Sequence, residues 1–163
     1  MMARTHIAMG VAVGSLGSLI FMQDDALAWW VGVLMGSIIP DIDHPQSKIG
    51  RWFPGISHLL HAAFGHRGGT HSVMFILLIS PAGALVSVPF GIGLSLGVLT
   101  HILADMVSFS KGQMFTRGGG CPLLWPFKDK RFGFRLVEVN GWFENLVLAP
   151  ASILLPIALL MAL

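Results

Sequence analysis

The chain has 163 residues, of which 54% are hydrophobic and only 11% are charged, and its mean hydropathy is +0.75. A soluble domain of this length carries about twice that charged share, so we expect one domain, residues 1–163, with much of its surface in lipid. The net charge of +2 does not indicate a nucleic-acid partner, and the single cysteine, Cys121, excludes an internal disulfide and a cysteine-based zinc finger.

Five apolar stretches predict transmembrane helices, because a helix that crosses the hydrocarbon core needs about 20 mostly apolar residues. In chain order they cover residues 7–22, 27–40, 72–88, 91–107 and 146–163. The amphipathic segment 49–65 is expected to form a short helix that lies at the membrane interface. The predicted fold class is therefore all-α: a polytopic membrane helix bundle with about five transmembrane helices and a short interfacial helix.

The basic residues predict the orientation of this bundle. All ten lysines and arginines fall on one side of the five-span arrangement. By the positive-inside rule this side is the cytoplasm, which puts the N-terminus inside and the C-terminus outside. The N-terminal segment also resembles a signal peptide, because it has Arg4, an apolar run and the sequence ALA at residues 26–28. Asp24 and Asp25, however, are a poor context for cleavage.

Carboxylates and imidazoles gather at the cytoplasmic ends of four predicted spans. His6 lies at the start of the first span, and PDIDHP, residues 40–45, follows the second. HRGGTH, residues 66–71, precedes the third span, and THILAD, residues 100–105, ends the fourth. Because these segments reach the same membrane face from separate helices, we expect their side chains to form one site.

Asp105 is the most informative of these residues. It lies four residues after His101, so both side chains share one face of a helix. An aspartate inside a membrane helix is unfavourable unless it is paired or metallated. One interpretation pairs Asp105 with His101, Arg67 or Lys111. The other pairs it with one or two divalent cations, and the mixture of imidazole and carboxylate ligands favours zinc, with manganese or iron as alternatives.

The same segments contain groups that suit a phosphate ester. Two metal ions could activate a water and hold a phosphoryl or acyl oxygen. Arg67 could bind a phosphate through two hydrogen bonds. Thr70 or Ser72 could cap the third span, whose N-terminus also favours an anion. Asp43 or His44 could act as the general base or orient a metal ligand.

Each of these features also has a purely structural interpretation. The segment PDIDH could be a helix stop with solvated acids, and HRGGTHS could be an anchor whose long side chains reach the interface. His58 and His61 are expected to pack or to face the interface. The segment 121–134 is expected to be an irregular or hairpin-like loop. The basic run KDKRFGFR, residues 128–135, is then a positive-inside loop or a contact for lipid headgroups.

Four motifs, PDIDHPQSKIG, FGHRGGTHS, HILADM and PLLWPF, occur in this order and resemble the YdjM-like family of LexA-regulated inner-membrane proteins with predicted metal-dependent hydrolase activity. The similarity runs from Thr5 to Glu144. The resemblance implies a multi-span protein of the inner (plasma) membrane with a hydrolase site. The family's motif residues fall on His6, Asp41, Asp43, His44, His66, Arg67, Thr70, His71, Ser72, His101, Asp105 and Glu144.

We therefore expect a divalent-metal-dependent hydrolase that cleaves a phosphoester of a lipid or lipid-linked substrate at the cytoplasmic face. The expected ligands of one or two metal ions are His6, Asp41, His66, His71, His101 and Asp105. The expected catalytic residues are Asp43, His44, Arg67 and Glu144, and the expected substrate-binding residues are Arg67, Thr70 and Ser72. The alternatives are a transporter of metal or other ions and a non-catalytic membrane protein with a structural metal site.

Overall fold

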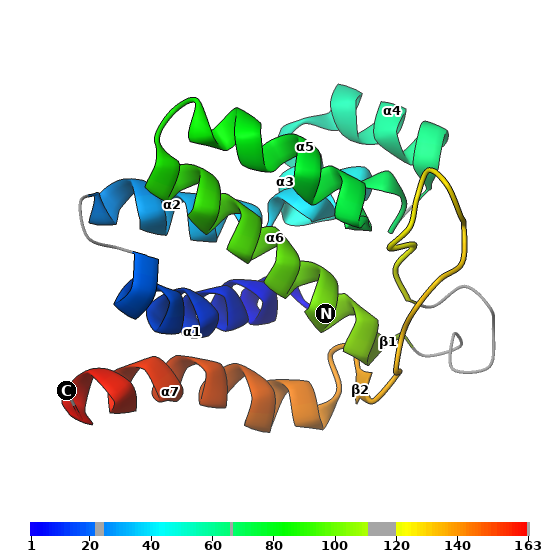
Figure 1. Cartoon of the computed structure of the whole chain (residues 1–163). Helices are drawn as coiled ribbons and strands as arrows, with labels where there is room; N and C mark the ends of the chain where they lie inside the picture. The colour runs from blue at the N-terminus through cyan, green and yellow to red at the C-terminus, as the bar shows by residue number, and fades with distance from the viewer. Residues whose placement is uncertain (22–24, 66, 111–119, 163) are drawn as a thin grey trace.

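The computed structural model describes residues 1–21, 25–65, 67–110 and 120–162, and most of these residues are helical (Figure 1). In chain order the elements are α1 (Ala3–Phe21), α2 (Ala26–Gly36), the 3-10 helix η1 (Ile39–Asp43), α3 (Lys48–Trp52), α4 (Pro54–Phe64), the 3-10 helix η2 (Gly69–His71), α5 (Val73–Ala84), α6 (Val88–Val107), β1 (Ser108–Phe109), β2 (Val137–Glu138), the π-helix η3 (Glu144–Leu148) and α7 (Ala149–Ala162).

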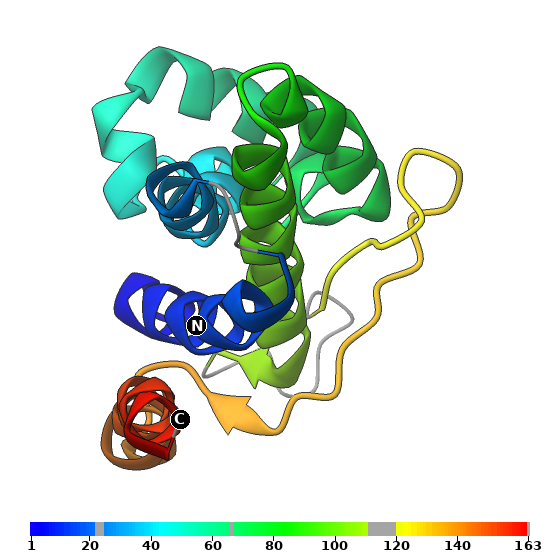
Figure 2. The ribbon, with the colours of Figure 1, turned by 60° about the vertical axis from the view of Figure 1, so that its left-hand side comes forward.

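Helix α6 is the centre of the bundle (Figure 2). It packs against α2, α5 and α1, and α7 lies against the other side of α1. Glycines allow α2 and α6 to approach closely: a Cβ added at Gly36 would overlap the carbonyl oxygen of Leu94, and one added at Gly97 would overlap that of Val33. This close approach brings the end of α2 beside the last turns of α6.

The helical prediction is confirmed, but a count of about five spans is not. Among the described residues, two segments are long and apolar enough to cross a membrane, Ala26–Asp43 and Val88–Val107. The third predicted span is shorter than expected, because α5 has only 12 residues. Ser87 caps α6 by accepting a hydrogen bond from the Phe90 N–H, and a proline lies in the first turn. Helix α6 therefore begins earlier than predicted, at Val88.

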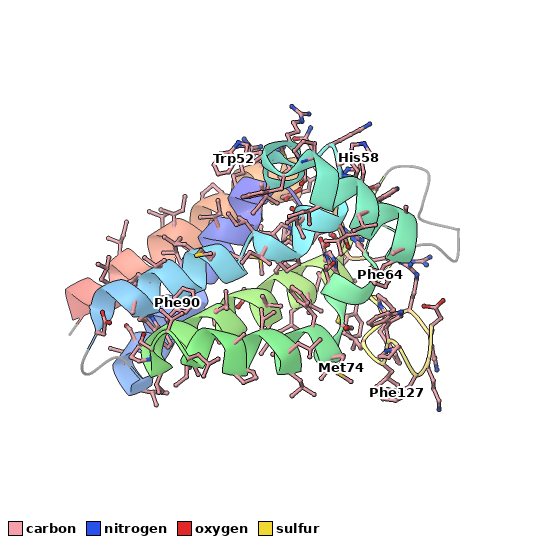
Figure 3. The ribbon with its side chains drawn as sticks, turned by 90° about the horizontal axis from the view of Figure 1, so that it is seen from above. Trp52, His58, Phe64, Met74, Phe90 and Phe127 are labelled. Atoms are coloured by element: carbon pink, nitrogen blue, oxygen red, sulfur yellow. The ribbon has the colours of Figure 1, made fainter. Side chains whose placement is uncertain are left out.

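The predicted interfacial helix is divided into two short helices. Pro54 stands in the first turn of α4, so the helical hydrogen-bond pattern of α3 does not continue through it. Trp52 on α3 and Leu59 on α4 are 76% and 71% exposed. Figure 3 shows α3 and α4 at one edge of the molecule, with Trp52 and His58 on its outer side. These exposed apolar side chains agree with a position at the lipid interface.

The loop after α6 contains structure that hydropathy does not predict. Strands β1 and β2 form a short parallel pair, with Ser108 opposite Val137. The expected hairpin-like character of the basic loop agrees with an antiparallel bridge between Cys121 and Phe132. The β1–β2 pair brings the chain back to the end of α6 just before Glu144, so this glutamate begins the last helical segment beside the N-terminus.

Candidate metal centre

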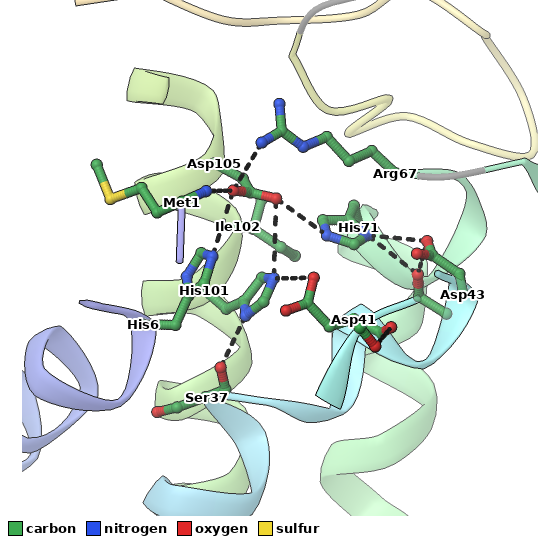
Figure 4. A network of polar contacts seen from close by, with 12 residues as sticks. Met1, His6, Ser37, Asp41, Asp43, Arg67, His71, His101, Ile102 and Asp105 are labelled. Atoms are coloured by element: carbon green, nitrogen blue, oxygen red, sulfur yellow. Dashed lines mark hydrogen bonds and ion pairs between the residues drawn. The ribbon is translucent and has the colours of Figure 1, made fainter. Parts of the chain in front are cut away.

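The carboxylate of Asp105 lies at the centre of a buried polar cluster (Figure 4). One of its oxygens, Oδ1, lies 2.9 Å from Nη2 of Arg67 and 3.3 Å from Nε2 of His6. The same oxygen accepts a hydrogen bond of 2.6 Å from the ammonium group of Met1. Asp105 is only 1% exposed. The predicted intramembrane aspartate therefore has several partners, and Arg67 is one of those that the sequence suggested.

The other oxygen of Asp105 faces two imidazoles. Oδ2 lies 3.3 Å from Nε2 of His71 and 3.8 Å from Nε2 of His101. Nδ1 of His101 lies 2.7 Å from the backbone oxygen of Ser37. Because a carbonyl oxygen can only accept, Nδ1 carries the proton and the lone pair of Nε2 points into the cluster. That lone pair also faces the carboxylate of Asp41, whose Oδ1 lies 3.7 Å away.

His6 reaches the same point from α1. Its ring stacks on that of His101 with the centroids 3.7 Å apart and the planes inclined by 10°. Nε2 of His6 and Nε2 of His101 face carboxylates without a well-formed hydrogen bond, and the buried Nδ1 of His6 has no partner within the part of the chain that the structure describes. Buried polar atoms usually have partners, so these nitrogens fit the role of metal ligands.

Two overlapping groups of residues have the geometry to hold a metal ion. In the first group, ligand atoms of His6, Asp41 and His101 lie within 4.8 Å of one another, and the second group consists of His71, His101 and Asp105. His101 belongs to both groups. Imidazole nitrogen and carboxylate oxygen are the ligands that suit zinc, manganese and iron. Five of the six predicted ligands therefore converge, and the sixth, His66, lies outside the described residues.

Asp43 lies behind His71 and away from Asp105. Its Oδ2 is 3.2 Å from Nδ1 of His71, and it accepts hydrogen bonds from the hydroxyl of Thr70 and the backbone N–H of Gly68. Burial lowers the pKa of His71, but the hydrogen bonds with Asp105 and Asp43 outweigh this effect and raise the pKa to about 9. This arrangement turns Nε2 of His71 toward Asp105, so Asp43 orients a candidate ligand.

Three further predicted residues make contacts outside this centre. Ser72 caps α5 by accepting from the Phe75 N–H at 3.2 Å, and Thr70 bonds to Asp43. The carboxylate of Glu144 accepts from the backbone N–H groups of Met2, at 2.7 Å, and Asn140, at 2.6 Å. Glu144 therefore holds the segment that leads into His6.

A polar cavity of about 320 Å³ opens beside the cluster. Among the expected site residues, Asp41, His44, Arg67 and Asp105 line it, together with Lys48, which sequence reasoning missed. The sequence does indicate Lys48, because this residue belongs to the motif PDIDHPQSKIG and lies only four residues after His44. Ser108, also missed, lies one helical turn after Asp105 and accepts a hydrogen bond of 3.0 Å from Nη2 of Arg67.

Cys121 does not contribute a ligand to this centre. It is fully buried, and burial raises the pKa of its thiol to about 12. Its Sγ lies 3.7 Å from the Ile102 carbonyl oxygen, and Cys121 belongs to neither of the two ligand groups found among the described residues. Nitrogen and oxygen atoms remain as the donors of the cluster.

The fold and the cluster define a helical membrane protein in which histidines and aspartates from separate helices meet. The chain belongs to the family of the YdjM inner membrane protein, whose model matches residues 1–162. This confirms the resemblance carried by the sequence motifs and supports a location in the membrane.

Comparison with curated proteins gives the same family. The chain is 39% identical over 118 residues to the inner membrane protein YdjM of Escherichia coli strain K12, which covers 66% of this chain and 54% of the relative. It is 36% identical over 152 residues to the protein YvsG of Bacillus subtilis strain 168, covering 91% and 88% of the two chains. The chain thus spans about half the length of the Escherichia coli relative. No solved structure matches it.

Proposed function

We propose that this protein is a divalent-metal-dependent hydrolase that cleaves a phosphoester of a lipid or lipid-linked substrate at the cytoplasmic face of the inner membrane. The observation that carries the proposal is the convergence of His6, His71, His101 and Asp105 at one buried point. Two imidazoles and one carboxylate, the set in each of the two ligand groups, are a common donor set for zinc.

The two overlapping ligand groups suit one or two ions, with zinc favoured over manganese or iron. A bound divalent cation supplies a Lewis acid, which lowers the pKa of water and stabilises negative charge on a phosphoryl oxygen. Nδ1 of His101 is held by the Ser37 carbonyl and Nδ1 of His71 lies against Asp43, so both rings present Nε2 to the centre. Such outer contacts fix ring orientation and increase ligand basicity.

Arg67 and His44 line the polar cavity, and we assign them phosphate binding and proton transfer. Arg67 is 7% exposed, and its guanidinium has nitrogens beyond the one that contacts Asp105. We assign it to phosphate binding, because a guanidinium matches two phosphate oxygens at once. His44 lines the same cavity and is half-buried, where an imidazole can take a proton from the attacking water as general base.

We propose that the centre lies at the cytoplasmic face and that five helical segments cross the membrane. The cluster receives residues from the first turn of α1, from η1 after α2, from η2 just before α5 and from the last two turns of α6. Helices that alternate in direction bring these ends to one side. All ten basic residues fall on that side of a five-span arrangement, which is the cytoplasmic side by the positive-inside rule.

The first experiment is a metal analysis of the full chain purified in detergent, followed by a screen of phospholipids and lipid phosphates with Zn²⁺ or Mn²⁺. We expect bound metal in the wild type and in the control His58→Ala, because His58 is exposed on α4 and bonds only to the Pro54 carbonyl oxygen among described partners. His71→Ala and Asp105→Ala should lose both metal and activity. Retention of metal in both variants would refute the proposal, and metal without hydrolysis would indicate a structural site.

A further inference from the structure

A second cavity, with mostly apolar walls, adjoins the polar one. Its volume is about 150 Å³, and it lies between α1, η1 and α3. Three of its residues, Ala3, Asp41 and Lys48, also line the polar cavity. The remaining wall is formed by Ile7, Ile38, Ile49 and Trp52. The candidate metal centre therefore adjoins a space with charged residues at one end and apolar residues at the other.

The apolar end of this cavity leads toward the surface expected to face lipid. Trp52 forms part of the wall and is 76% exposed at the outer edge of α3 (Figure 3). Ile7 also lines a larger groove of about 610 Å³ between α1, α2 and α7, which extends to Val11 and Ser15. At 1.5 Å per residue, the path along α1 from Ile7 to Ser15 is about 12 Å long.

The charged end of the cavity offers a cation for an anionic headgroup. Lys48 is exposed and lines both cavities. Its ammonium group has no ion pair or hydrogen bond with any residue in the described ranges, whereas Arg67 across the polar cavity is held by Asp105. A phosphate beside Asp41 needs such a charge, because the carboxylates of the centre would otherwise repel it.

We propose that the cavity formed by Ile7, Ile38, Ile49 and Trp52 holds the hydrocarbon chain of the substrate lipid, and that Lys48 binds the phosphate of its headgroup. This inference rests on the proposed function and specifies its substrate class: a lipid whose phosphate enters the centre from the bilayer side. A water-soluble phosphate ester would leave the isoleucine wall exposed to water, whereas an acyl chain removes that apolar surface from water.

The test is photolabelling of the full-length protein in nanodiscs with lysophosphatidic acid that carries a diazirine in the middle of its acyl chain. We expect saturable labelling of peptides that contain Ile38, Ile49 and Trp52, which unlabelled lysophosphatidic acid displaces. Ile49→Trp should fill the cavity and lower this labelling about tenfold. The matched control Leu78→Trp lies on an exposed part of α5 and should leave the labelling unchanged.

Lys48→Gln tests the headgroup contact. We expect it to raise the concentration of unlabelled lysophosphatidic acid needed for displacement about tenfold, with bound metal unchanged. The effect should disappear for an uncharged competitor, monoacylglycerol, which has the same chain without the phosphate. Equal displacement of the label in wild type and Lys48→Gln would overturn the role of Lys48.

The labelling tests the cavity that binds the lipid chain, whereas the hydrolysis assay tests the proposed enzyme activity. Saturable labelling of the cavity without any hydrolysis would keep the lipid site and overturn the proposed enzyme. Labels confined to outward-facing residues such as Leu77, Leu78 and Leu146, or no saturable labelling, would overturn the chain-binding cavity even if the protein hydrolyses a phosphate ester.

Discussion

The imidazole rings of His6 and His101 lie stacked with their centroids 3.7 Å apart, although they come from α1 and α6, which are far apart in the sequence. The stack joins α1 to α6 and places both rings beside the carboxylate of Asp105. His101 is common to both candidate ligand groups. It is therefore the residue whose loss should affect the centre most.

His101→Ala should abolish metal binding by both groups, and we expect bound metal to fall at least about tenfold, as it does when even supporting residues of metal sites are removed. Mass spectrometry of metals in the purified protein measures this. His61→Ala is a suitable control, because His61 is exposed and its Nδ1 lies 3.0 Å from the Asp43 backbone oxygen and outside both groups. Equal loss in both variants would show that general damage to the fold, and not ligation, is responsible.

Asp43→Asn should weaken metal binding while the fold persists. The amide keeps the shape of the side chain but removes the negative charge beside Nδ1 of His71, so His71 becomes a weaker ligand. We expect about 10- to 100-fold lower zinc affinity in a competition titration with a fluorescent chelator. The control is Asp129→Asn in the exposed basic loop, which should bind zinc as the wild type does.

Arg67→Lys should separate phosphate binding from metal binding. Lysine retains the positive charge beside Asp105 but cannot form a pair of parallel hydrogen bonds with a phosphate. The loss of one charge-assisted hydrogen bond is worth about 1.5–3 kcal/mol, so kcat/KM for an active lipid phosphate should fall about tenfold or more. Metal content should stay at the wild-type level, and a loss of metal would show that Arg67 mainly maintains the cluster.

Gly36→Ala should disturb the centre from a distance. The added methyl group would overlap the Leu94 carbonyl oxygen and force α2 away from α6. Overpacking of this kind costs about 1–3 kcal/mol, so the thermal midpoint should fall by several degrees and metal affinity should fall with it, because Ser37 would move from His101. Gly55→Ala is the control, since a Cβ there meets nothing within 4 Å. It should leave both measurements unchanged.

The sequence alone predicts the class and the family of this protein and names the residues that meet in the cluster. High hydropathy with few charges indicates a membrane protein, because exposed charges are what a soluble surface requires. The spacing of His101 and Asp105 places both on one face of a helix whatever surrounds them. The motifs identify the family and nominate the ligands, since a metal site uses a small set of side-chain types.

The sequence left Asp43 with two possible roles, a general base or a residue that orients a metal ligand. In the 3-10 helix η1, Asp41 faces His101, whereas Asp43 lies behind His71 and orients it. Hydropathy also could not place the start of α6, predicted at residue 91, because the cap at Ser87 allows the helix to begin at Val88. Each of these outcomes depends on hydrogen bonds that form only in a particular backbone geometry.

Only the tertiary structure decided which remote groups meet. The contact of His6 with His101 depends on how closely helices α1, α2 and α6 pack, and that spacing is set by glycines where these helices touch. The position of Lys48 between a polar and an apolar cavity likewise follows from where α3 lies against α1 and η1. Short-range patterns specify which side chains are available, whereas packing in three dimensions determines the distances at which they act.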